Sequence, residues 1–429
     1  MADAKSNSRS PWFWIPTLYL AEGLPYALAM SVSVVLYKNL GVSNTAIAFY
    51  TGWLYLPWVI KPLWSPVVDI LKTRRQWIWT MQFFIGAMLA AIALTIPAPH
   101  FFQWTLAFFW LLAFSSATHD IAADGFYMLA TTEREQSFYN GIRSTFYRVA
   151  TILAQGELIN FVGKMHARTG NFISVWSATF EIVAVIYIGL MIYHFFILPK
   201  PQTDVSKPIA STELFFAEFL KTFGTFFQKP KILLLLSFLL LYRLGEAQLV
   251  KMVQPFLLDS HVAGGLGLDD TLVGRIYGRY GIISLMLGGI LGGFVVARHG
   301  LKFWLWPMLL AIHLPDAVFI WLAYSQPQNL FVIGAGVAVE QFGYGFGFTA
   351  FMLYMIYVAR GEHRTAHYAI CTGFMALGMM LPGMWSGWLQ EKIGYAHFFV
   401  WVVLATIPSF IVAMKIPLDA EFGKRTRAN

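Results

Sequence analysis

Long apolar runs separated by short polar segments dominate the chain. A helix that crosses a bilayer core needs about 20 mostly apolar residues, and runs of this length recur along the 429 residues. This pattern predicts an all-α membrane protein. Twelve spans are predicted, near residues 12–37, 44–68, 77–96, 101–130, 137–162, 172–198, 232–258, 271–297, 303–323, 329–358, 366–390 and 396–416.

The predicted spans form two sets of six on either side of a polar stretch. Residues 199–231 hold no long apolar run, and we interpret them as a cytoplasmic linker between an N-terminal bundle, 1–198, and a C-terminal bundle, 232–429. The segment 45–52 (TAIAFYTG) opens the second span, and 271–278 (TLVGRIYG) opens the eighth, 226 residues later. The recurrence predicts two pseudo-symmetric six-helix bundles, as in transporters built from parallel repeats.

Composition agrees with a membrane location. Hydrophobic residues make up 58% of the chain and charged residues only 12%, whereas a soluble domain holds about 25% charged residues. So few ions do not cover a water-exposed surface of this size. The single cysteine, Cys371, excludes an intrachain disulfide.

The formal charge of +8 raises the question of a nucleic-acid partner. With the N-terminus in the cytoplasm, 19 of the 30 lysines and arginines fall in cytoplasmic segments and 4 in outer ones. The positive-inside rule therefore predicts that both termini are cytoplasmic. Because the basic residues are spread over short loops rather than one patch, nucleic acid is not expected as a partner. The expected partners of a monomeric chain are the lipid bilayer and a small molecule.

Many ionisable residues lie inside the predicted spans. Each costs at least about 2.5–3.5 kcal/mol at a helix centre, so they are expected to line a central polar cavity or to pair with one another. A cavity of this kind is what a transporter needs. The basic members are Lys61, Arg143, Arg148, Arg243, Lys251, Arg275 and Arg279. The acidic members are Glu22, Asp120, Asp124, Glu157, Glu181, Glu246, Asp316 and Glu340.

Three of these acids are candidates for proton coupling. Asp120 and Asp124 are four residues apart and share one face of the fourth span. Two carboxylates in a cleft of low dielectric repel, which raises the affinity of the pair for a proton. Glu22 lies about 15 Å into the first span, near the membrane midplane. The alternative is that Asp120 and Asp124 only neutralise a basic residue, either Arg143, Arg148 or Lys61.

The seventh and eighth spans present a polar, net positive face. Arg243, Glu246, Lys251 and Gln254 fall within one arc of about 140° at 100° per residue. Such a face suits a substrate with a carboxylate, which an arginine binds in a bidentate manner. The alternative is internal pairing, for example of Glu246 with an arginine of the eighth span, Arg275 or Arg279. The candidate substrate-binding residues are Arg143, Arg148, Tyr127, Tyr26, Lys61, Arg243, Glu246, Lys251, Gln254 and Arg279.

Motifs of enzymes and ATP-driven pumps are missing from the sequence. It contains no G-x-x-x-x-G-K-[ST] loop, no H-E-x-x-H pair and no nucleophile elbow. One cysteine cannot form a zinc cluster. The sequence therefore predicts neither an enzyme nor a bound metal or cofactor.

Three segments resemble the AmpG-type muropeptide permease branch of the major facilitator superfamily. They are 21–28 (AEGLPYAL), 61–69 (KPLWSPVVD) and 116–124 (SATHDIAAD). The resemblance covers the N-terminal half, whereas the C-terminal half matches through topology only. It implies the major facilitator fold and proton-driven import of N-acetylglucosaminyl-anhydromuramyl peptide across the bacterial inner membrane, a step of peptidoglycan recycling. It also makes Asp120 and Asp124 this chain's version of the family's acidic pair.

A cytoplasmic loop resembles the superfamily's loop between helices 2 and 3. There Asp69, Arg74 and Arg75 would latch the two halves in the outward-facing state, although Ser65 stands where the motif has glycine. AmpG-type permeases are often longer, with two extra helices for which this chain has no room. A siderophore importer or an acetyl-CoA-type transporter of the same branch is the alternative. A non-transporting receptor is disfavoured because no segment is long enough for a soluble signalling domain.

Overall fold

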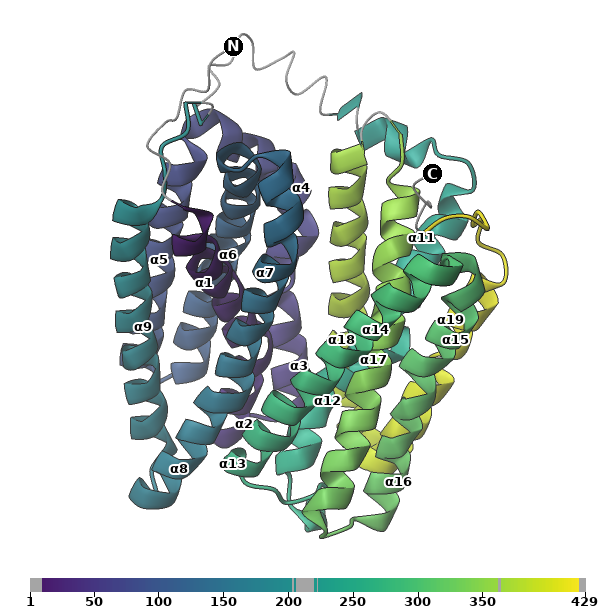
Figure 1. Cartoon of the computed structure of the whole chain (residues 1–429). Helices are drawn as coiled ribbons and strands as arrows, with labels where there is room; N and C mark the ends of the chain where they lie inside the picture. Colours follow the sequence, from purple (N-terminus) through teal and green to yellow (C-terminus); the bar gives the residue numbers. More distant parts are fainter. Residues whose placement is uncertain (1–9, 203, 206–219, 222, 362–363, 424–429) are drawn as a thin grey trace, which may run out of the picture.

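The computed structural model describes residues 10–202, 204–205, 220–221, 223–361 and 364–423. In this part of the chain the regular structure is entirely helical, without a β-strand. Figure 1 shows the helices of the first half of the chain side by side, next to a second group formed by the second half. The predicted linker, 199–231, lies partly outside the described residues, so the division into two bundles stays a prediction.

In the first group, several predicted spans are divided into two or more consecutive helices. Its helices are η1 (Pro11–Phe13), α1 (Ile15–Ala27), η2 (Leu28–Val32), α2 (Ser33–Asn39), α3 (Asn44–Trp53), α4 (Leu56–Leu71), α5 (Arg74–Thr95), α6 (Phe101–Ala130), α7 (Glu133–Ile152), η3 (Leu153–Leu158), α8 (Ile159–Thr169) and α9 (Phe172–Ile197). Capping boxes at Thr73 and Thr132 fix the starts of α5 and α7.

The second group repeats this arrangement. Its helices are α11 (Ile232–Leu241), α12 (Leu244–Leu258), η4 (His261–Ala263), α13 (Asp270–Val273), η5 (Gly274–Gly281), α14 (Ile282–His299), α15 (Leu301–His313), η6 (Leu314–Asp316), α16 (Ala317–Ser325), α17 (Leu330–Val358), α18 (Arg364–Leu404) and α19 (Ile407–Ala413). Gly394, at φ 74° and ψ 164°, divides α18 into two helices. It separates the predicted spans 366–390 and 396–416.

Among the described residues, nine helical segments are long and apolar enough to cross a membrane, and one of them contains both helices of α18. Two predicted spans fall outside this set, α3–α4 and α7–α8. They are helical but carry polar residues such as Lys61 and Arg148. The all-α membrane fold is confirmed, and the two less apolar spans lie beside the cavity described below.

Apolar side chains fill the inside of each group and also cover its outside. Phe109, Trp176 and Phe180 are fully buried in the first group, and Phe238 and Phe351 in the second. Large apolar side chains also project outward, as an exposed surface in lipid requires.

Polar contacts join the two groups at one end of the molecule. The Lys38 ammonium lies 2.7 Å from an Asp259 carboxylate oxygen, and the Tyr395 hydroxyl donates to the same carboxylate at 2.7 Å. Asn44 donates to the Gln390 side chain at 2.7 Å, and Asn39 donates to Asp270 at 3.0 Å. We call this end the closed end.

Glycines allow the two groups to approach closely at the same end. A Cβ on Gly278 of η5 would lie 2.0 Å from the Gln155 carbonyl oxygen of η3. A Cβ on Gly387 of α18 would lie 2.0 Å from the Asn44 carbonyl oxygen. Backbone atoms meet here, so a side chain at either glycine has no space.

Candidate functional site

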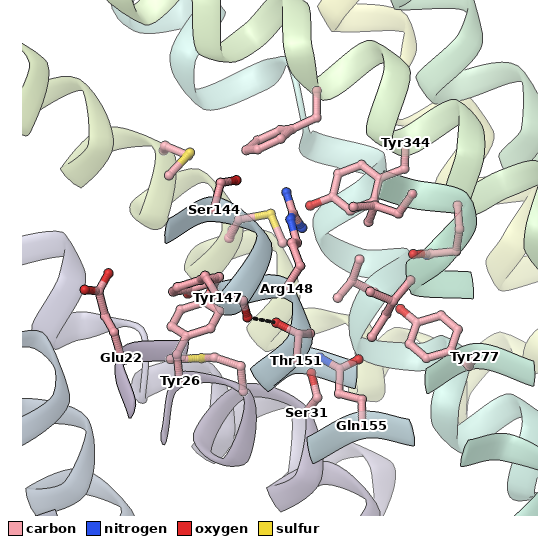
Figure 2. A pocket seen from close by; sticks show the side chains of 18 of the residues that line it. Glu22, Tyr26, Ser31, Ser144, Tyr147, Arg148, Thr151, Gln155, Tyr277 and Tyr344 are labelled. Atoms are coloured by element: carbon pink, nitrogen blue, oxygen red, sulfur yellow. Dashed lines mark hydrogen bonds between the residues drawn. The ribbon is translucent and has the colours of Figure 1, made fainter. Parts of the chain in front are cut away.

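A cavity of about 510 Å³ lies between the two groups of helices. This volume falls within the range of small-molecule sites. Figure 2 shows its polar lining, in which Arg148 lies between Tyr147 on one side and Tyr344 on the other. The lining residues are Tyr19, Glu22, Tyr26, Met30, Ser31, Tyr55, Arg143, Ser144, Tyr147, Arg148, Thr151, Gln155, Arg243, Val250, Tyr277, Ile282, Leu285, Gln341, Tyr344, Phe348, Met375 and Met379.

A side pocket of about 250 Å³ shares Tyr26 and Arg243 with this cavity and holds Lys61 and Asp120. The Lys61 ammonium lies 3.1 Å from the Asp120 carboxylate, and the two side chains are 25% and 16% exposed. The Trp58 indole N–H donates to the same carboxylate oxygen at 3.2 Å. Asp120 is therefore already neutralised by a cation.

Asp124, one helical turn further along α6, is paired in the same way. Arg143 lies 3.2 Å from its carboxylate, and the Tyr19 hydroxyl donates to it at 3.1 Å. The guanidinium of Arg143 also lies over the rings of Tyr19 and Tyr127, at 4.7 and 5.1 Å from their centroids. Both aspartates of the fourth span thus form the ion pairs that the sequence offered as the alternative to proton coupling.

Arg148 of α7 differs from the other basic residues of the cavity. In the part of the chain that the structure describes, it has neither a hydrogen-bond nor an ion-pair partner. Its side chain is half-buried and lines the cavity. A guanidinium in a confined polar space attracts an anionic group strongly, because the low local dielectric strengthens the attraction.

Arg243 enters the cavity from the second group. It precedes α12, at the break that separates α12 from α11. Its guanidinium donates to the Tyr344 hydroxyl and lies over the rings of Tyr344 and Phe348 at 5.1 and 4.8 Å. Its Nε atom is buried and has no hydrogen-bond partner.

Glu22 lines the cavity with 7% exposure. Among the described residues, no lysine or arginine nitrogen lies within 4 Å of its carboxylate, and its Oε2 atom has no hydrogen-bond partner. Of the three predicted coupling residues, Glu22 is the one that lines the cavity itself, and its coupling role stays a prediction.

A buried polar network supports the aspartate-bearing helix from behind. Gln82 of α5 contacts His119 at 2.9 Å and His194 of α9 at 3.0 Å. His194 contacts Thr17 of α1 at 3.0 Å through its other ring nitrogen. These contacts fix the rotation of α6, so that Asp120, next to His119, points to the side pocket.

Several predicted substrate-binding residues do not line the cavity. Lys251 is buried and donates to the Thr51 hydroxyl at 2.8 Å across the two groups. Gln254 is buried deeper along α12. Arg279 forms a bidentate pair with Glu157 of the first group, with both hydrogen bonds at 2.7 Å. Lys251 and Arg279 therefore connect the two groups of helices at the closed end. Arg279 pairs with Glu157 and not with Glu246, the partner that the sequence offered as an alternative.

Two further predicted residues have neighbours that differ from those expected. Tyr127 does not line the cavity, but its ring packs against the Arg143 guanidinium. Glu246 lies away from the cavity lining, in a buried cluster with Asp316 and Glu340. The remaining predicted residues, Tyr26, Lys61, Arg143, Arg148 and Arg243, surround the cavity and its side pocket.

The predicted gating residues are placed in part. The side chain of Asp69 lies outside the described residues. The backbone amides of Arg74 and Arg75 donate to the Asp204 carboxylate at 2.8 and 3.0 Å, at the N-terminus of α5. The Arg75 guanidinium donates to the Leu198 carbonyl at 3.2 Å, so these contacts tie the loop to its own half of the molecule.

The sequence-based prediction missed much of the polar lining. Ser144, Thr151 and Gln155 line the cavity from α7 and η3, and Gln341 and Tyr344 from α17. A signal for the first three was present, because polar residues at 144, 147, 148, 151 and 155 follow the spacing of one helical face. No comparable pattern marks α17, whose cavity residues are embedded among glycines and aromatics.

Comparison with known proteins agrees with this architecture. The Putative transporter AmpG 4 of Rickettsia conorii is 25% identical over 94% of this chain and 95% of its own length. The Anhydromuropeptide permease of Escherichia coli K12 is 24% identical over 96% of this chain and 80% of its own length. The resemblance to AmpG-type transporters is thus confirmed, and it extends beyond the N-terminal half.

Solved transporter structures share the fold. A bacterial homolog of the human lysosomal transporter Spinster, inward-facing and unoccupied, superposes with a TM-score of 0.69 at 16% identity, covering 96% of each chain. A D-xylose-proton symporter superposes with a TM-score of 0.67 at 12% identity, covering 97% of this chain and 99% of its own. These relatives and neighbours are transporters rather than enzymes. The sequence model of the Major Facilitator Superfamily matches residues 17–381, and the chain therefore belongs to that superfamily.

Proposed function

We propose that the chain is a proton-coupled secondary transporter that imports an amino-sugar peptide of the muropeptide class across the bacterial inner membrane. Such a solute combines sugar rings, amide and hydroxyl groups, and one or more carboxylates. Each of these chemical features has a counterpart among the residues that line the cavity.

The observation that carries the proposal is Arg148, a cavity cation without a partner among the described residues. A peptide or lactyl carboxylate is the group that a guanidinium binds in a bidentate manner. Tyr26 and Tyr147, with ring centroids 6.4 Å apart, offer faces and hydroxyls to a sugar ring. Ser144 and Gln155 supply further hydrogen-bonding groups to amides and hydroxyls.

The similarity to the Anhydromuropeptide permease of Escherichia coli supports this substrate class. The acids in or beside the cavity support coupling to protons. In this proposal Glu22 exchanges protons with the cavity, while Asp120 and Asp124 respond through their ion pairs with Lys61 and Arg143.

The contacts between the two groups of helices support import by alternating access. In this proposal both termini are cytoplasmic, the closed end faces outward, and the cavity opens to the cytoplasm. Opening of that end breaks the contacts of Asp259 and the Arg279–Glu157 pair. Two bundles, 1–198 and 232–429, then rock about the cavity and expose it to the other side.

Uptake into proteoliposomes tests the proposal. We expect accumulation of a labelled anhydromuropeptide that depends on an inward proton gradient. Arg148→Gln removes a charge-assisted contact worth about 1.5–3 kcal/mol, so KM is expected to rise roughly 10- to 100-fold. Arg298→Gln, at an exposed arginine near the end of α14, serves as the matched control.

Two results would overturn the proposal. Accumulation of a ferric siderophore or acetyl-CoA, without accumulation of the glycopeptide, would assign the chain to another substrate class of the same branch. Unchanged glycopeptide uptake in the Arg148→Gln variant would remove the anion-binding role of this residue.

A further inference from the structure

Three acidic side chains meet inside the second group of helices. Glu246 comes from α12, Asp316 from η6 and Glu340 from α17. One carboxylate oxygen from each lies within 4.8 Å of the other two. Glu246 and Asp316 are 0% exposed, and Glu340 is 1% exposed. Three spans that are distant in sequence thus place three carboxylates together in a buried region, and we call these three residues the acidic cluster.

The acidic cluster is also short of hydrogen-bond donors. Among the residues that the structure describes, neither oxygen of Glu246 and neither oxygen of Asp316 has a hydrogen-bond partner. Glu340 accepts from the Gln341 amide at 3.0 and 3.3 Å. Buried polar atoms are nearly always paired, and a buried unpaired charge is far more costly than a neutral group. Four buried oxygens without a partner, in two carboxylates that meet a third within 4.8 Å, therefore point to a bound positive species.

Broken helices aim their positive ends at the acidic cluster. Glu246 lies in the first turn of α12, directly after the break between α11 and α12. Asp316 ends η6, which leads into α16. The N-terminus of a helix favours negative charge, so both helix starts stabilise an ionised carboxylate. The helix ends make an ionised state of the cluster reachable.

Other titratable groups surround the cluster. Arg243, three residues before Glu246, acts on it electrostatically. Tyr277 of η5 interacts with Glu246 and Glu340, and Tyr344 of α17 interacts with Glu246. His313 of α15 precedes Asp316 and contacts the Ser409 hydroxyl at 3.0 Å. From α18, the uncharged residues Val402 and Thr406 pack against Gly245.

We propose that Glu246, Asp316 and Glu340 form a proton-binding site in the second group of helices, and that this site controls Arg243 in the substrate cavity. Each proton bound converts one carboxylate to a carboxylic acid and raises the net charge of the cluster by one. Three like charges at this spacing do not coexist without compensation in a dry interior. Arg243 balances one negative charge, and protons shared among the three side chains balance the others.

The protonation state of the acidic cluster determines whether Arg243 interacts with the cluster or with the substrate. When the cluster holds its protons, it attracts Arg243 weakly, and the guanidinium is available to an anionic substrate in the cavity. When the cluster loses a proton, Glu246 attracts Arg243, and the substrate loses a cation. Proton binding and substrate binding therefore favour each other, which is the linkage that a symporter needs. This step rests on the proposed function, whereas proton binding by the cluster does not.

Infrared difference spectroscopy of the purified protein tests proton binding without any substrate. We expect the C=O stretch of buried carboxylic acids to disappear as the pH is raised, and to weaken in Glu340→Gln and Asp316→Asn variants. Asp419→Asn, at an acid that follows the last helix and is 65% exposed, is the matched control and keeps the full band. A band that is identical in wild type and cluster variants would overturn the proposal. A band displaced by Na⁺ but not by choline at constant pH would replace it with a sodium site.

Transport assays test the linkage separately. In Glu340→Gln proteoliposomes we expect loss of pH-driven accumulation with retention of substrate exchange at equal concentrations, because the amide mimics a permanently protonated acid. Retained exchange shows that the variant is folded. Unchanged pH-driven accumulation together with an altered infrared band would refute the link through Arg243 while leaving the proton site intact. Failure of wild-type exchange itself would count against the proposed substrate instead.

Discussion

Asp120 and Asp124 of the first half and the acidic cluster of the second half differ in burial and in counter-ions. In the first half, Asp120 and Asp124 each contact a cation, and their side chains are 16% and 41% exposed beside the cavity. In the second half, Glu246, Asp316 and Glu340 are almost fully buried. Among the described residues, no lysine or arginine nitrogen lies within 4 Å of them.

The difference indicates which acids have a permanent counter-ion and which depend on an exchangeable positive species. Lysine and arginine side chains are permanent counter-ions, and pairs that are partly wet keep the geometry of a binding cavity constant. Carboxylates without such partners need a positive species that comes and goes. We infer that the pairs of Asp120 and Asp124 help to shape the substrate site, whereas the acidic cluster, like Glu22, is available to a driving ion.

This division of roles requires the two halves to move against each other, and a bulky side chain at Gly278 is expected to stop that motion. A Cβ at this position already lies 2.0 Å from the Gln155 carbonyl oxygen, so Gly278→Leu prevents the closed end from forming. We expect uptake to fall below detection. Ala48, which is buried against Gly387, then becomes accessible from outside.

The accessibility is measured with an Ala48→Cys reporter and a membrane-impermeant maleimide, after Cys371→Ser has removed the native cysteine. Gly293→Leu is the control, because a Cβ there has no neighbour within 4 Å. Normal uptake and unchanged labelling in the Gly278→Leu protein would show that the contact is not required for closure.

The next effect in size concerns the fixed pair of the first half. Lys61→Met leaves Asp120 with the Trp58 indole as its remaining described contact. We expect a loss of about 1–3 kcal/mol in the free energy of unfolding, because a partly buried carboxylate loses its counter-ion. Thermal unfolding in detergent, followed by tryptophan fluorescence, measures this loss.

The double variant Lys61→Met, Asp120→Asn is the control for the pair. It removes both charges, so we expect it to recover most of the lost stability. If the double variant is as unstable as Lys61→Met alone, the loss comes from packing of the lysine side chain, and the ion pair is not the cause.

The sequence was sufficient to predict most of the fold. The apolar runs and the two related halves follow from the length and composition that a bilayer imposes on helices. The pattern did not predict the breaks within spans, such as the one between α11 and α12 and the one at η6, because each involves only two or three residues in an otherwise apolar run. The side chain of Asp69 lies outside the described residues, so the gating motif stays a prediction.

The candidate site was predicted less completely, for a physical reason. Residues on one helix, such as Arg143 and Arg148, reveal their common face through helical spacing. The acidic cluster joins three spans, and which face of each span meets the others depends on packing that no local pattern records. The same holds for Arg279, whose partner Glu157 lies 122 positions earlier in the chain.

The smallest expected effect is the most informative for the comparison. Glu340→Gln replaces a carboxyl group by an amide of nearly the same shape. If protons already neutralise the cluster, this change costs at most about 0.5 kcal/mol of unfolding free energy at neutral pH, since it removes no compensated charge. At alkaline pH the variant is expected to be the more stable protein, because it avoids one ionised group in a dry interior. Thermal unfolding across a pH series measures both. A loss at neutral pH as large as that of Lys61→Met would mean that Glu340 is a charged structural partner, and the two halves would then treat their acids alike.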